Sequence, residues 1–546
     1  MNIALAQLNY HIGNFEYNTK KIIDHIQLAK DKGADLVVFA ELAICGYPPR
    51  DFLEFDEFIG LCETAAQEIA THCKGIACIV GLPVRNEVLA GKDLYNAAYF
   101  IEEGKVKAIA KKALLPNYDV FDEYRYFEPA TQFECIAFKG RKIALTICED
   151  LWNINNNPLY VSNPMDELIK QKPDLMINIA ASPFSYCHDD ERVVVLADNA
   201  KKYKLPLLYV NQVGAQTEIV FDGGSLAFDK EGNLLDEMAY FKEELKIYEV
   251  DGDVIKGYAP KTHRAVQDTE QIYEALVLGI KDYFAKSGFK KAVLGLSGGI
   301  DSAIVCALAC RALGAENVMA VLMPSKYSSD HSIQDALDLV KNIGCQHEII
   351  PIKEAANAFD SMMAPAFKGL PLNLTEENIQ ARCRGIIVMA MSNKFGYILL
   401  NTSNKSECAV GYGTLYGDMC GAIGVIGDVY KTQVYQLANY INKEEIVIPE
   451  NSIVKPPSAE LRPGQKDSDS LPDYDILDKI LFQYIELKQS SSGIIAQGYD
   501  EALVRRILKM VNTAEFKRYQ TPPILRVSPK AFGMGRRMPI VGKYLS

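Results

Sequence analysis

A glycine-rich turn between an apolar run and a helix-forming segment constrains this chain more than any other feature. The turn follows the apolar residues 292–294 and precedes the helix-like residues 303–308. Such a strand–turn–helix unit is typical of parallel α/β sheets, where backbone N–H groups at the turn surround phosphates. The motif lacks the Gly-Lys-Ser/Thr ending of a Walker A loop, so no lysine of the loop reaches the phosphates. The loop residues are Gly295, Leu296, Ser297, Gly298, Gly299, Ile300, Asp301 and Ser302.

The rest of the second half repeats this alternation. We predict a parallel α/β sheet with helical crossovers. A stretch from Ser458 to Tyr474 is rich in Pro, Ser, Gly and Asp, which predicts either a mobile loop near a site or a plain solvated linker. The expected strands are 292–295, 318–323, 347–352 and 397–401, and the expected helices are 301–313, 331–343 and 376–395.

The first half predicts a different layered α/β fold, in which hairpins at 102–105 and 229–233 extend the sheets. A chain of 546 residues is too long for one core, and its pattern changes in the polar stretch 251–266. We therefore predict a domain over 1–250, a linker over 251–266 and a domain over 267–546. The expected strands are 3–8, 36–40, 76–82, 143–147, 175–179 and 207–211, and the expected helices are 18–31, 57–72 and 192–201.

Composition excludes several classes of partner. The net charge of −12 argues against nucleic acid, which needs a basic surface. The 13 cysteines contain no CxxC pair, which is typical of reduced thiols in a cytoplasmic protein. The start of the chain lacks the features of a signal peptide, and no apolar run approaches the roughly 20 residues of a membrane span. We expect a cytoplasmic protein that binds neither nucleic acid nor membrane.

Three separated residues in the first half suit the cleavage of an amide. Glu41 and Cys148 each follow an apolar run, and Lys112 precedes Ala-Leu-Leu-Pro. Amide hydrolysis needs a nucleophile, a base that activates it and a donor for the oxyanion. A thiol, a carboxylate and an ammonium can fill these roles. Each residue alone is more often a core thiol, an edge carboxylate or a surface charge.

The sequence around these residues resembles the nitrilase-type carbon–nitrogen hydrolases. Residues 112–123 with 126–129 are similar to the second motif of that family, and 148–150 to its nucleophile motif. The resemblance covers about residues 1–250. It implies an αββα sandwich with a catalytic Glu41–Lys112–Cys148 triad. In the glutamine-using branch, it also implies that Tyr118 and Ser182 hold the substrate.

One position departs from the pattern of that branch, which places Lys or Arg six residues after the serine to pair with the glutamine carboxylate. This chain has His188 there. A neutral imidazole binds a carboxylate more weakly than a fixed cation does. Arg192, one helical turn further on, is the favoured substitute, because its charge does not depend on a shifted pKa.

The glycine-rich loop resembles that of pyrophosphate-loop ATPases, which adenylate a carboxylate and release pyrophosphate. Five later segments resemble glutamine-dependent NAD⁺ synthetases over about residues 265–546. The resemblance implies that Thr402 contacts ATP and that Asp301 and Glu407 hold Mg²⁺. It implies that Asn378, Glu407 and Lys517 contact nicotinic acid adenine dinucleotide, and that the protein is a homo-oligomer, at least a dimer. The segments are 376–382, 402–407, 416–418, 457–461 and 515–518.

The family resemblance predicts an ATP-dependent amidation through an acyl-adenylate, with ammonia taken from glutamine. Three alternatives stay open. The chain could be another pyrophosphate-loop amidotransferase, such as an asparagine- or GMP-forming enzyme, although these resemble it only at the loop. It could be a stand-alone amidase whose second half is a nucleotide-binding regulatory module. It could also be a catalytically inactive scaffold, against which the intact Glu41, Lys112, Cys148 and Asp301 speak.

Overall fold

The computed structural model describes the chain except for residues 89, 155–158, 187, 265–266 and 545–546. The chain forms two compact units, Met1–Val266 and Gln267–Ser546. The last two residues of the predicted linker lie outside the described residues. The predicted limits of the domains and the linker stay a prediction.

The first unit contains two large β-sheets and a hairpin formed by β10 (Val213–Gln216) and β11 (Ile219–Asp222). The first sheet has the order β15 (Val254–Ile255), β14 (Glu244–Asp251), β1 (Asn2–Gln7), β2 (Leu36–Val38), β3 (Ala77–Arg85), β4 (Leu94–Glu102) and β5 (Lys105–Lys111). The second sheet has the order β13 (Leu234–Glu237), β12 (Leu226–Phe228), β9 (Leu207–Asn211), β8 (Leu175–Ala180), β7 (Arg141–Ile147) and β6 (Ile136–Phe138).

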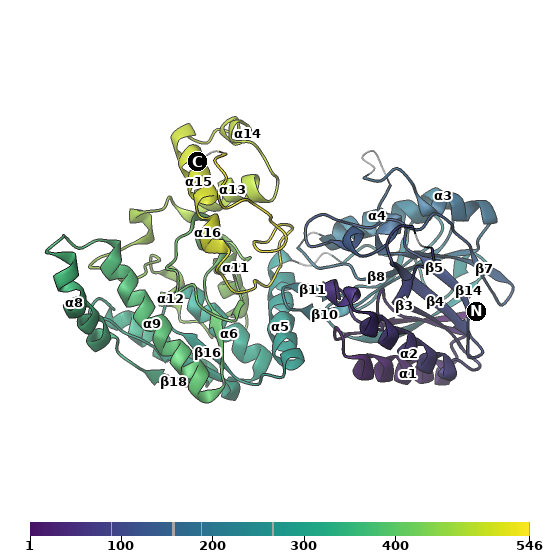
Figure 1. Cartoon of the computed structure of the whole chain (residues 1–546), viewed down its shortest axis with the longest axis horizontal. Coiled ribbons are helices and arrows are strands. Elements are labelled where there is room, and N and C mark those ends of the chain that lie inside the picture. Colours follow the sequence, from purple (N-terminus) through teal and green to yellow (C-terminus); the bar gives the residue numbers. More distant parts are fainter. Residues whose placement is uncertain (89, 155–158, 187, 265–266, 545–546) are drawn as a thin grey trace. The chain divides into compact units, whose positions relative to one another are not determined.

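Strand β1 shows why this half forms a four-layered sandwich. Ile3 and Leu5 belong to the core between the sheets, whereas Ala4 and Ala6 pack under the outer helices. Successive side chains of a strand point to opposite faces, so a strand that is apolar at every position is buried on both. Figure 1 shows α1 (Phe15–Asp31) and α2 (Asp56–His72) on one outer side and α3 (Pro164–Leu168) and α4 (His188–Tyr203) on the other. The predicted αββα sandwich is confirmed.

Part of the predicted linker belongs to the first sheet. All six residues of β1 pair antiparallel with residues 244–249 of β14. The last two residues of β14 pair with β15 in a short hairpin. The hairpin turn at Gly252 has a φ of +64°, which glycine adopts at little cost. The polar composition that predicted a linker therefore marks a hairpin at the sheet edge as well.

The second unit contains an all-parallel sheet, as predicted. Strand β16 lies in the middle, and the connections leave it in both directions. Ligands of open α/β sheets bind beyond the carboxyl ends of the strands at such a point. The glycine-rich loop follows β16 directly, so the topology places it at this position. The order is β18 (Gln346–Ile349), β17 (Val318–Leu322), β16 (Ala292–Gly295), β19 (Ile398–Asn401) and β20 (Ile423–Gly424).

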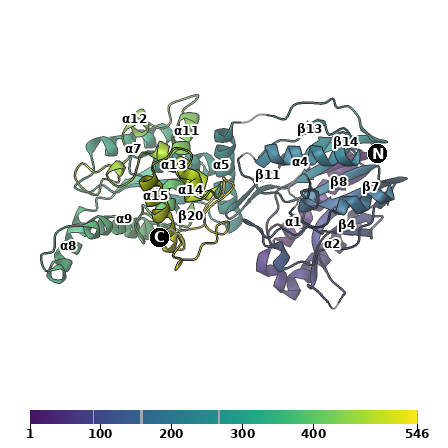
Figure 2. The ribbon, with the colours of Figure 1, turned by 90° about the horizontal axis from the view of Figure 1, so that it is seen from above.

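Helices cover both faces of this sheet. Val293 and Val321 pack with Val388 of α9 on one face, and α6 crosses the other with α5 and α7 beside it. Figures 1 and 2 both show α8 beyond the end of α9, and no residue of α8 is buried. None of the described helices is long and apolar enough to cross a membrane. These helices are α5 (Asp268–Ser287), α6 (Ile300–Leu313), α7 (Asp330–Ile343), α8 (Lys353–Phe367) and α9 (Leu374–Phe395).

A second core joins the remaining helices to residues near the end of the chain. Lys405, wholly buried, donates from Nζ to Ser528 Oγ at 2.7 Å and forms an ion pair with Asp428 at 2.9 Å. Ile524 and Phe532 pack into the same cluster. The helices are α10 (Lys405–Val410), α11 (Lys431–Ile441), α12 (Glu450–Val454), α13 (Tyr474–Ile485), α14 (Ser491–Ile495), α15 (Glu501–Thr513) and α16 (Glu515–Arg518).

An ion-pair cluster fastens the end of the first unit to α4. His263 Nδ1 lies 2.9 Å from Glu237 Oε1, and Nε2 lies 3.3 Å from Asp190 Oδ1. Interactions with Asp189 and Glu237 raise the pKa of His263 from 6.5 to about 9, against burial, which lowers it. The charged imidazole therefore stabilises the fold fully below about pH 6.5, and the contribution is lost as pH rises through about 9. Solvent screening of this half-buried group limits the contribution to about 1–2 kcal/mol.

His263→Gln is expected to lower the free energy of unfolding by about 1–2 kcal/mol near pH 6 and by much less near pH 10, because the imidazole is neutral at the higher pH. Urea unfolding followed by circular dichroism at both pH values measures the difference. His72→Gln, in the exposed last turn of α2, is the matched control. An equal loss at both pH values would show that the charge of His263 is not the cause.

Candidate functional site

The end of β7 presents Cys148 on a strained turn. Cys148 has a φ of +45°, a conformation that non-glycine residues rarely adopt. The carboxylate of Asp150 holds the turn, since it accepts hydrogen bonds from the backbone N–H of Ile147 at 3.0 Å, Ala113 at 3.0 Å and Leu114 at 2.9 Å. One buried side chain thus fixes the Cys148 turn and ties it to the segment that follows Lys112.

Lys112 brings two carboxylates together in the interior. Its ammonium Nζ donates to Glu41 Oε1 at 2.7 Å and to Glu123 Oε2 at 2.8 Å. Glu41 also accepts from Asn96 Nδ2 at 2.7 Å and from the backbone N–H of Ala181 at 3.0 Å. The side chains of Glu41 and Lys112 are wholly buried. These three hydrogen bonds hold the Glu41 carboxylate in one orientation.

The charges of this cluster reach Cys148. Burial raises the pKa of the Cys148 thiol well above its usual value, and the charge of Glu41 raises it further, while Lys112 opposes both. Burial also raises the pKa of Glu123 to about 7. Burial lowers the pKa of Lys112, but Glu123 and Glu41 outweigh this and hold it well above the usual range. The resting site therefore contains a protonated thiol and a permanent ammonium, and a nearby carboxylate can take the thiol proton.

The structure brings together the three residues predicted as catalytic and adds others that the sequence analysis missed. Glu123 and Asn96 contact the triad, and Asp150 shapes its turn. Glu123 and Asp150 both lie within the motifs that carry the family resemblance. A buried lysine needs carboxylate partners, and this requirement was the available signal for Glu123. Asn96 lies inside β4, and no motif in the sequence pointed to it.

Tyr118, predicted to bind glutamine, lies at the rim of this site. Its hydroxyl donates to Glu149 Oε1 at 2.9 Å, and Tyr160 donates to the same oxygen at 2.9 Å. The Tyr118 side chain is 42% exposed. Glu149, next to Cys148, is buried, and burial raises its pKa. Polar side chains and the accessible ring of Tyr118 therefore border the thiol of Cys148.

Ser182 and His188 form a second part of the predicted glutamine subsite. Ser182 follows β8, where its N–H donates to Asn211 Oδ1 at 2.9 Å and its hydroxyl lies 3.3 Å from His188 Nε2. The Trp152 ring stacks on the imidazole at a centroid distance of 5.2 Å. Helix α4 begins at His188, four residues before the helix predicted from residue 192. The imidazole is held in place and remains partly exposed beside the buried serine.

Arg192, the favoured alternative, occupies a different environment. Its guanidinium donates from Nη1 and Nη2 to the two oxygens of Asp222, at 3.1 Å and 2.7 Å. Both side chains are almost wholly buried. A bidentate pair of this kind is a strong and oriented contact. The geometry therefore favours His188 over Arg192 as the partner of the glutamine carboxylate, because Arg192 is buried and paired with Asp222. His188 stays partly exposed, and the carboxylate next to it, 3.6 Å away, belongs to the exposed Glu191.

The glycine-rich loop lines a cavity of about 590 Å³ in the second unit. Gly299 is the N-cap of α6, so the first amides of this helix lie at the cavity. Gly298 has a φ of +81°, and a Cβ atom there would lie 2.1 Å from Ser332 O. Only glycine fits this position. Residues 457–462 and 464–467 also line the cavity, which favours a loop near a site over a plain solvated linker, the two alternatives for 458–474.

Two predicted metal ligands meet inside this cavity. Asp301 accepts hydrogen bonds from Asn404 Nδ2 at 3.0 Å and from Lys431 Nζ. Glu407 lies close enough for the charge of Asp301 to change its pKa. Burial and the negative charge of Asp301 raise the pKa of Glu407 well above its usual value, although Lys431 lowers it. Hard carboxylate oxygens in negative excess are a donor set that suits Mg²⁺. The residues present therefore fit the predicted ion.

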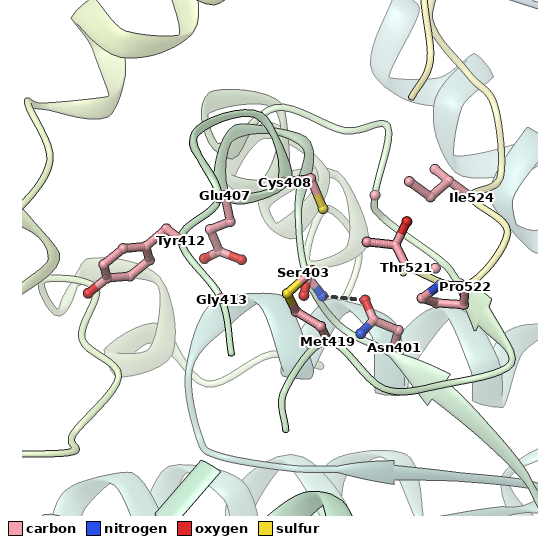
Figure 3. Close-up of a pocket in the computed structure, with 13 residues that line it drawn as sticks. Asn401, Ser403, Glu407, Cys408, Tyr412, Gly413, Met419, Thr521, Pro522 and Ile524 are labelled. Carbon is pink, nitrogen blue, oxygen red and sulfur yellow. Dashed lines mark hydrogen bonds between the residues drawn. The ribbon is translucent and has the colours of Figure 1, made fainter. Parts of the chain in front are cut away.

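The remaining predicted residues divide between two places. Thr402 lines the large cavity, whereas Asn378 and Lys517 do not. Asn378 accepts from Thr414 Oγ1 at 2.7 Å, and Lys517 Nζ donates to the carbonyls of Gly411 at 2.8 Å and Gly413 at 2.7 Å. Both glycines line a small adjacent pocket, where Figure 3 shows Glu407 across from Thr521 and Pro522.

Glu407 lines both the large cavity and the small pocket. Asn401, Ser403 and Tyr412 also line both, so these residues together connect the nucleotide-binding loop with the region around Lys517. The structure also adds Lys431, Asn404 and Arg384 to the predicted set. Burial lowers the pKa of Arg384, whose Nε donates to the Met323 carbonyl at 3.1 Å.

Comparisons with known proteins match both halves of the chain. Residues 2–259 match the carbon-nitrogen hydrolase family, and residues 272–521 match the NAD synthase family. The chain is 47% identical to the glutamine-dependent NAD(+) synthetase of Synechocystis sp., with 98% of each chain covered. It is 39% identical to that of Thermotoga maritima, with 100% and 99% covered.

A solved structure is also similar over the whole length. It is the glutamine-dependent NAD⁺ synthetase of Acinetobacter baumannii in complex with adenosine diphosphate, with a TM-score of 0.79 and 38% identity. The comparison covers 100% of this chain and 99% of that one.

Gly298→Ala is expected to destabilise the second unit by at least about 2 kcal/mol, because it combines a strained φ with a clash against backbone. Gly295→Ala is the matched control, since the nearest atom to its Cβ is Met323 Cε at 3.0 Å, the end of a flexible side chain. The midpoints of thermal unfolding measure both effects. Equal shifts in the two variants would contradict the steric argument.

Proposed function

The chain belongs to the family of glutamine-dependent NAD⁺ synthetases, and on that premise we propose which residues carry each step. The enzyme forms NAD⁺ with nitrogen taken from glutamine. In the proposal, the first unit hydrolyses glutamine and the second adenylates nicotinic acid adenine dinucleotide. The observation that carries the proposal is the buried Lys112 ammonium, paired with Glu41 and Glu123 next to Cys148.

Glutamine hydrolysis begins at Cys148. Glu41 takes the thiol proton as the sulfur attacks the carboxamide carbon, and Lys112 stabilises the oxyanion. Glu41 then gives the proton to the departing nitrogen, which leaves ammonia and a thioester. Water, deprotonated by Glu41, attacks the thioester and releases glutamate. Glu123 orients Lys112 and keeps it charged throughout the cycle.

Amide formation takes place at the glycine-rich loop. The nicotinate carboxylate attacks the α-phosphorus of ATP, which gives an acyl-adenylate and pyrophosphate. Ammonia then attacks the activated carbonyl carbon and displaces AMP. The loop amides at the start of α6 hold pyrophosphate, and Thr402 contacts ATP. The complex of the Acinetobacter baumannii relative with adenosine diphosphate supports an adenine nucleotide as a ligand of this chain.

Asp301 and Glu407 would hold Mg²⁺, which supplies positive charge against the phosphates when bound. Lys431, which contacts Asp301, places a further cation at the same edge of the cavity. Lys517 and Asn378 are proposed to contact the dinucleotide substrate around the small pocket next to Glu407. The homo-oligomeric state and the cytoplasmic location expected from the sequence stay predictions.

The glutamine carboxylate is proposed to lie against His188. The imidazole is fixed by Trp152 and faces the Ser182 hydroxyl, while Arg192 is buried against Asp222. The imidazole can donate a hydrogen bond to a carboxylate from the nitrogen that faces the subsite. The position that departs from the pattern of the branch is thus proposed to keep its role with a histidine.

Cys148→Ala is expected to abolish synthesis with glutamine and to leave synthesis with ammonia largely intact, because only the first unit needs a thiol nucleophile. Asp301→Ala is the complementary control and should abolish synthesis from both nitrogen sources. NAD⁺ formation from nicotinic acid adenine dinucleotide, ATP and Mg²⁺ measures both. Glutamine-dependent synthesis by Cys148→Ala would refute the assignment. Glutaminase activity without any NAD⁺ formation in the wild type would favour the stand-alone amidase.

His188→Ala is expected to raise the KM for glutamine by roughly 10- to 150-fold, the value of one charge-assisted hydrogen bond of about 1.5–3 kcal/mol. His188→Lys, which places a fixed cation at this position, should leave the KM close to that of the wild type. Steady-state glutaminase kinetics of the wild type and of both variants at one pH measure the effects. An unchanged KM in His188→Ala would return the role to Arg192 or to backbone groups.

A further inference from the structure

Three cysteines of the second unit converge outside the catalytic machinery. Cys306 and Cys310 lie one turn apart on α6, and Cys345 precedes β18. Their sulfur atoms all lie within 4.8 Å of one another, and the Cys306 and Cys345 sulfurs are 3.9 Å apart. Among the described residues, no other three cysteines come this close. None of the three lines the large cavity or the small pocket.

The spacing of the sulfurs suits a tetrahedral metal ion. Zinc–thiolate bonds of about 2.3 Å at tetrahedral angles separate two sulfurs by about 3.8 Å. The separation of Cys306 and Cys345 already has this value, and Cys310 is on the same face of α6 because residues four apart on a helix are neighbours. A disulfide would need its sulfurs at about 2.05 Å.

The electrostatics of the cluster favour a thiolate. Interactions with the Cys306 and Cys310 thiols lower the pKa of Cys345 to about 4, whereas burial raises it. Contacts with its two neighbours and burial raise the pKa of Cys306 well above its usual value, and that of Cys310 is raised to about 12, so the metal-free cluster holds one thiolate between two thiols. Cys306 is fully buried, while Cys310 and Cys345 are 9% and 6% exposed, so the cluster opens toward solvent on one side. His347, exposed on β18, lies close enough to favour the charged form of Cys345.

We propose that Cys306, Cys310 and Cys345 bind one Zn²⁺ ion as thiolates, with water as the fourth ligand. Three sulfur–metal bonds form and the protons of the thiols pass to solvent, with no change of oxidation state. The ion would tie the middle of α6, which begins at the glycine-rich loop, to the strand at the sheet edge. Because the ion binds the folded state, it would raise the stability of the second unit.

Cd²⁺, which prefers thiolates as Zn²⁺ does, is the probe for the first test. The full-length Cys148→Ala chain is used so that the catalytic thiol does not compete. Titration of the reduced protein should produce thiolate-to-metal absorption that saturates at one ion per chain. Competition with a chromophoric chelator then gives the affinity for Zn²⁺. The protons released on Zn²⁺ binding should be measurable in weakly buffered solution.

In the same background, Cys310→Ser should weaken Zn²⁺ binding by more than about 100-fold. Loss of a mere outer-shell partner costs 10- to 100-fold, and a direct ligand should cost more. Cys383→Ser is the matched control, because Cys383 is buried in α9 of the same unit and belongs to no such cluster. It should leave the Zn²⁺ affinity and the absorption unchanged.

Ammonia-dependent synthesis by each variant reports whether the second unit is folded. Should Cys310→Ser fail to fold, Cys345→Ser replaces it, since that residue lies outside the helix. Equal Zn²⁺ affinity in a folded ligand variant and in the parent would overturn the proposal. Absence of thiolate–metal absorption in the parent would overturn it too, as would a Cys306–Cys345 disulfide in a chain that binds no Zn²⁺.

Discussion

The first unit depends on a buried ammonium. Lys112 is removed from water between Glu41 and Glu123, and an uncompensated charge in that position would cost several kcal/mol. The three residues come from the ends of β2 and β5 and from the loop that follows β5, so the ammonium is paired only when β2, β3, β4 and β5 are assembled in the first sheet. Cys148 arrives from the second sheet and meets this charged group across the sandwich. The fold and the chemistry are therefore set by the same contact.

The second unit also buries a lysine among carboxylates, but there the negative charges outnumber the positive charge. Lys431 faces Asp301 and Glu407, and Asp467 adds a third carboxylate that responds to the same charges. The excess of negative charge leaves room for a divalent cation, whereas the carboxylates around Lys112 are occupied by hydrogen bonds from the protein. In the proposed function, a buried lysine thus supports acid–base chemistry in one unit and a cation site in the other.

Much of the fold could be predicted because its signals are local. Apolar runs located the central strands, and helix signals located α6, α7 and α9 to within a few residues. The exposed α8 and the hairpin β10–β11 were missed, because α8 contains Pro365 and buries no residue, and each strand of the hairpin has only four residues. At the sites, the motif residues were found, but the partners that neutralise them come from elsewhere in the chain. Asn96, Lys431 and the burial of Arg192 against Asp222 are consequences of tertiary packing, which a single sequence does not display.

The core around Lys405 has a consequence for the order in which the two units fold during translation. The first unit closes when β14 pairs with β1, so its last essential strand has been made once about residue 251 has left the ribosome. The second unit needs Ser528 and Phe532 to complete the cluster around Lys405 and α13. Domains fold as units in the order in which they emerge. The first unit can therefore fold while the second unit is still being translated. During that interval the nascent chain holds the glutaminase unit without the unit that uses its ammonia.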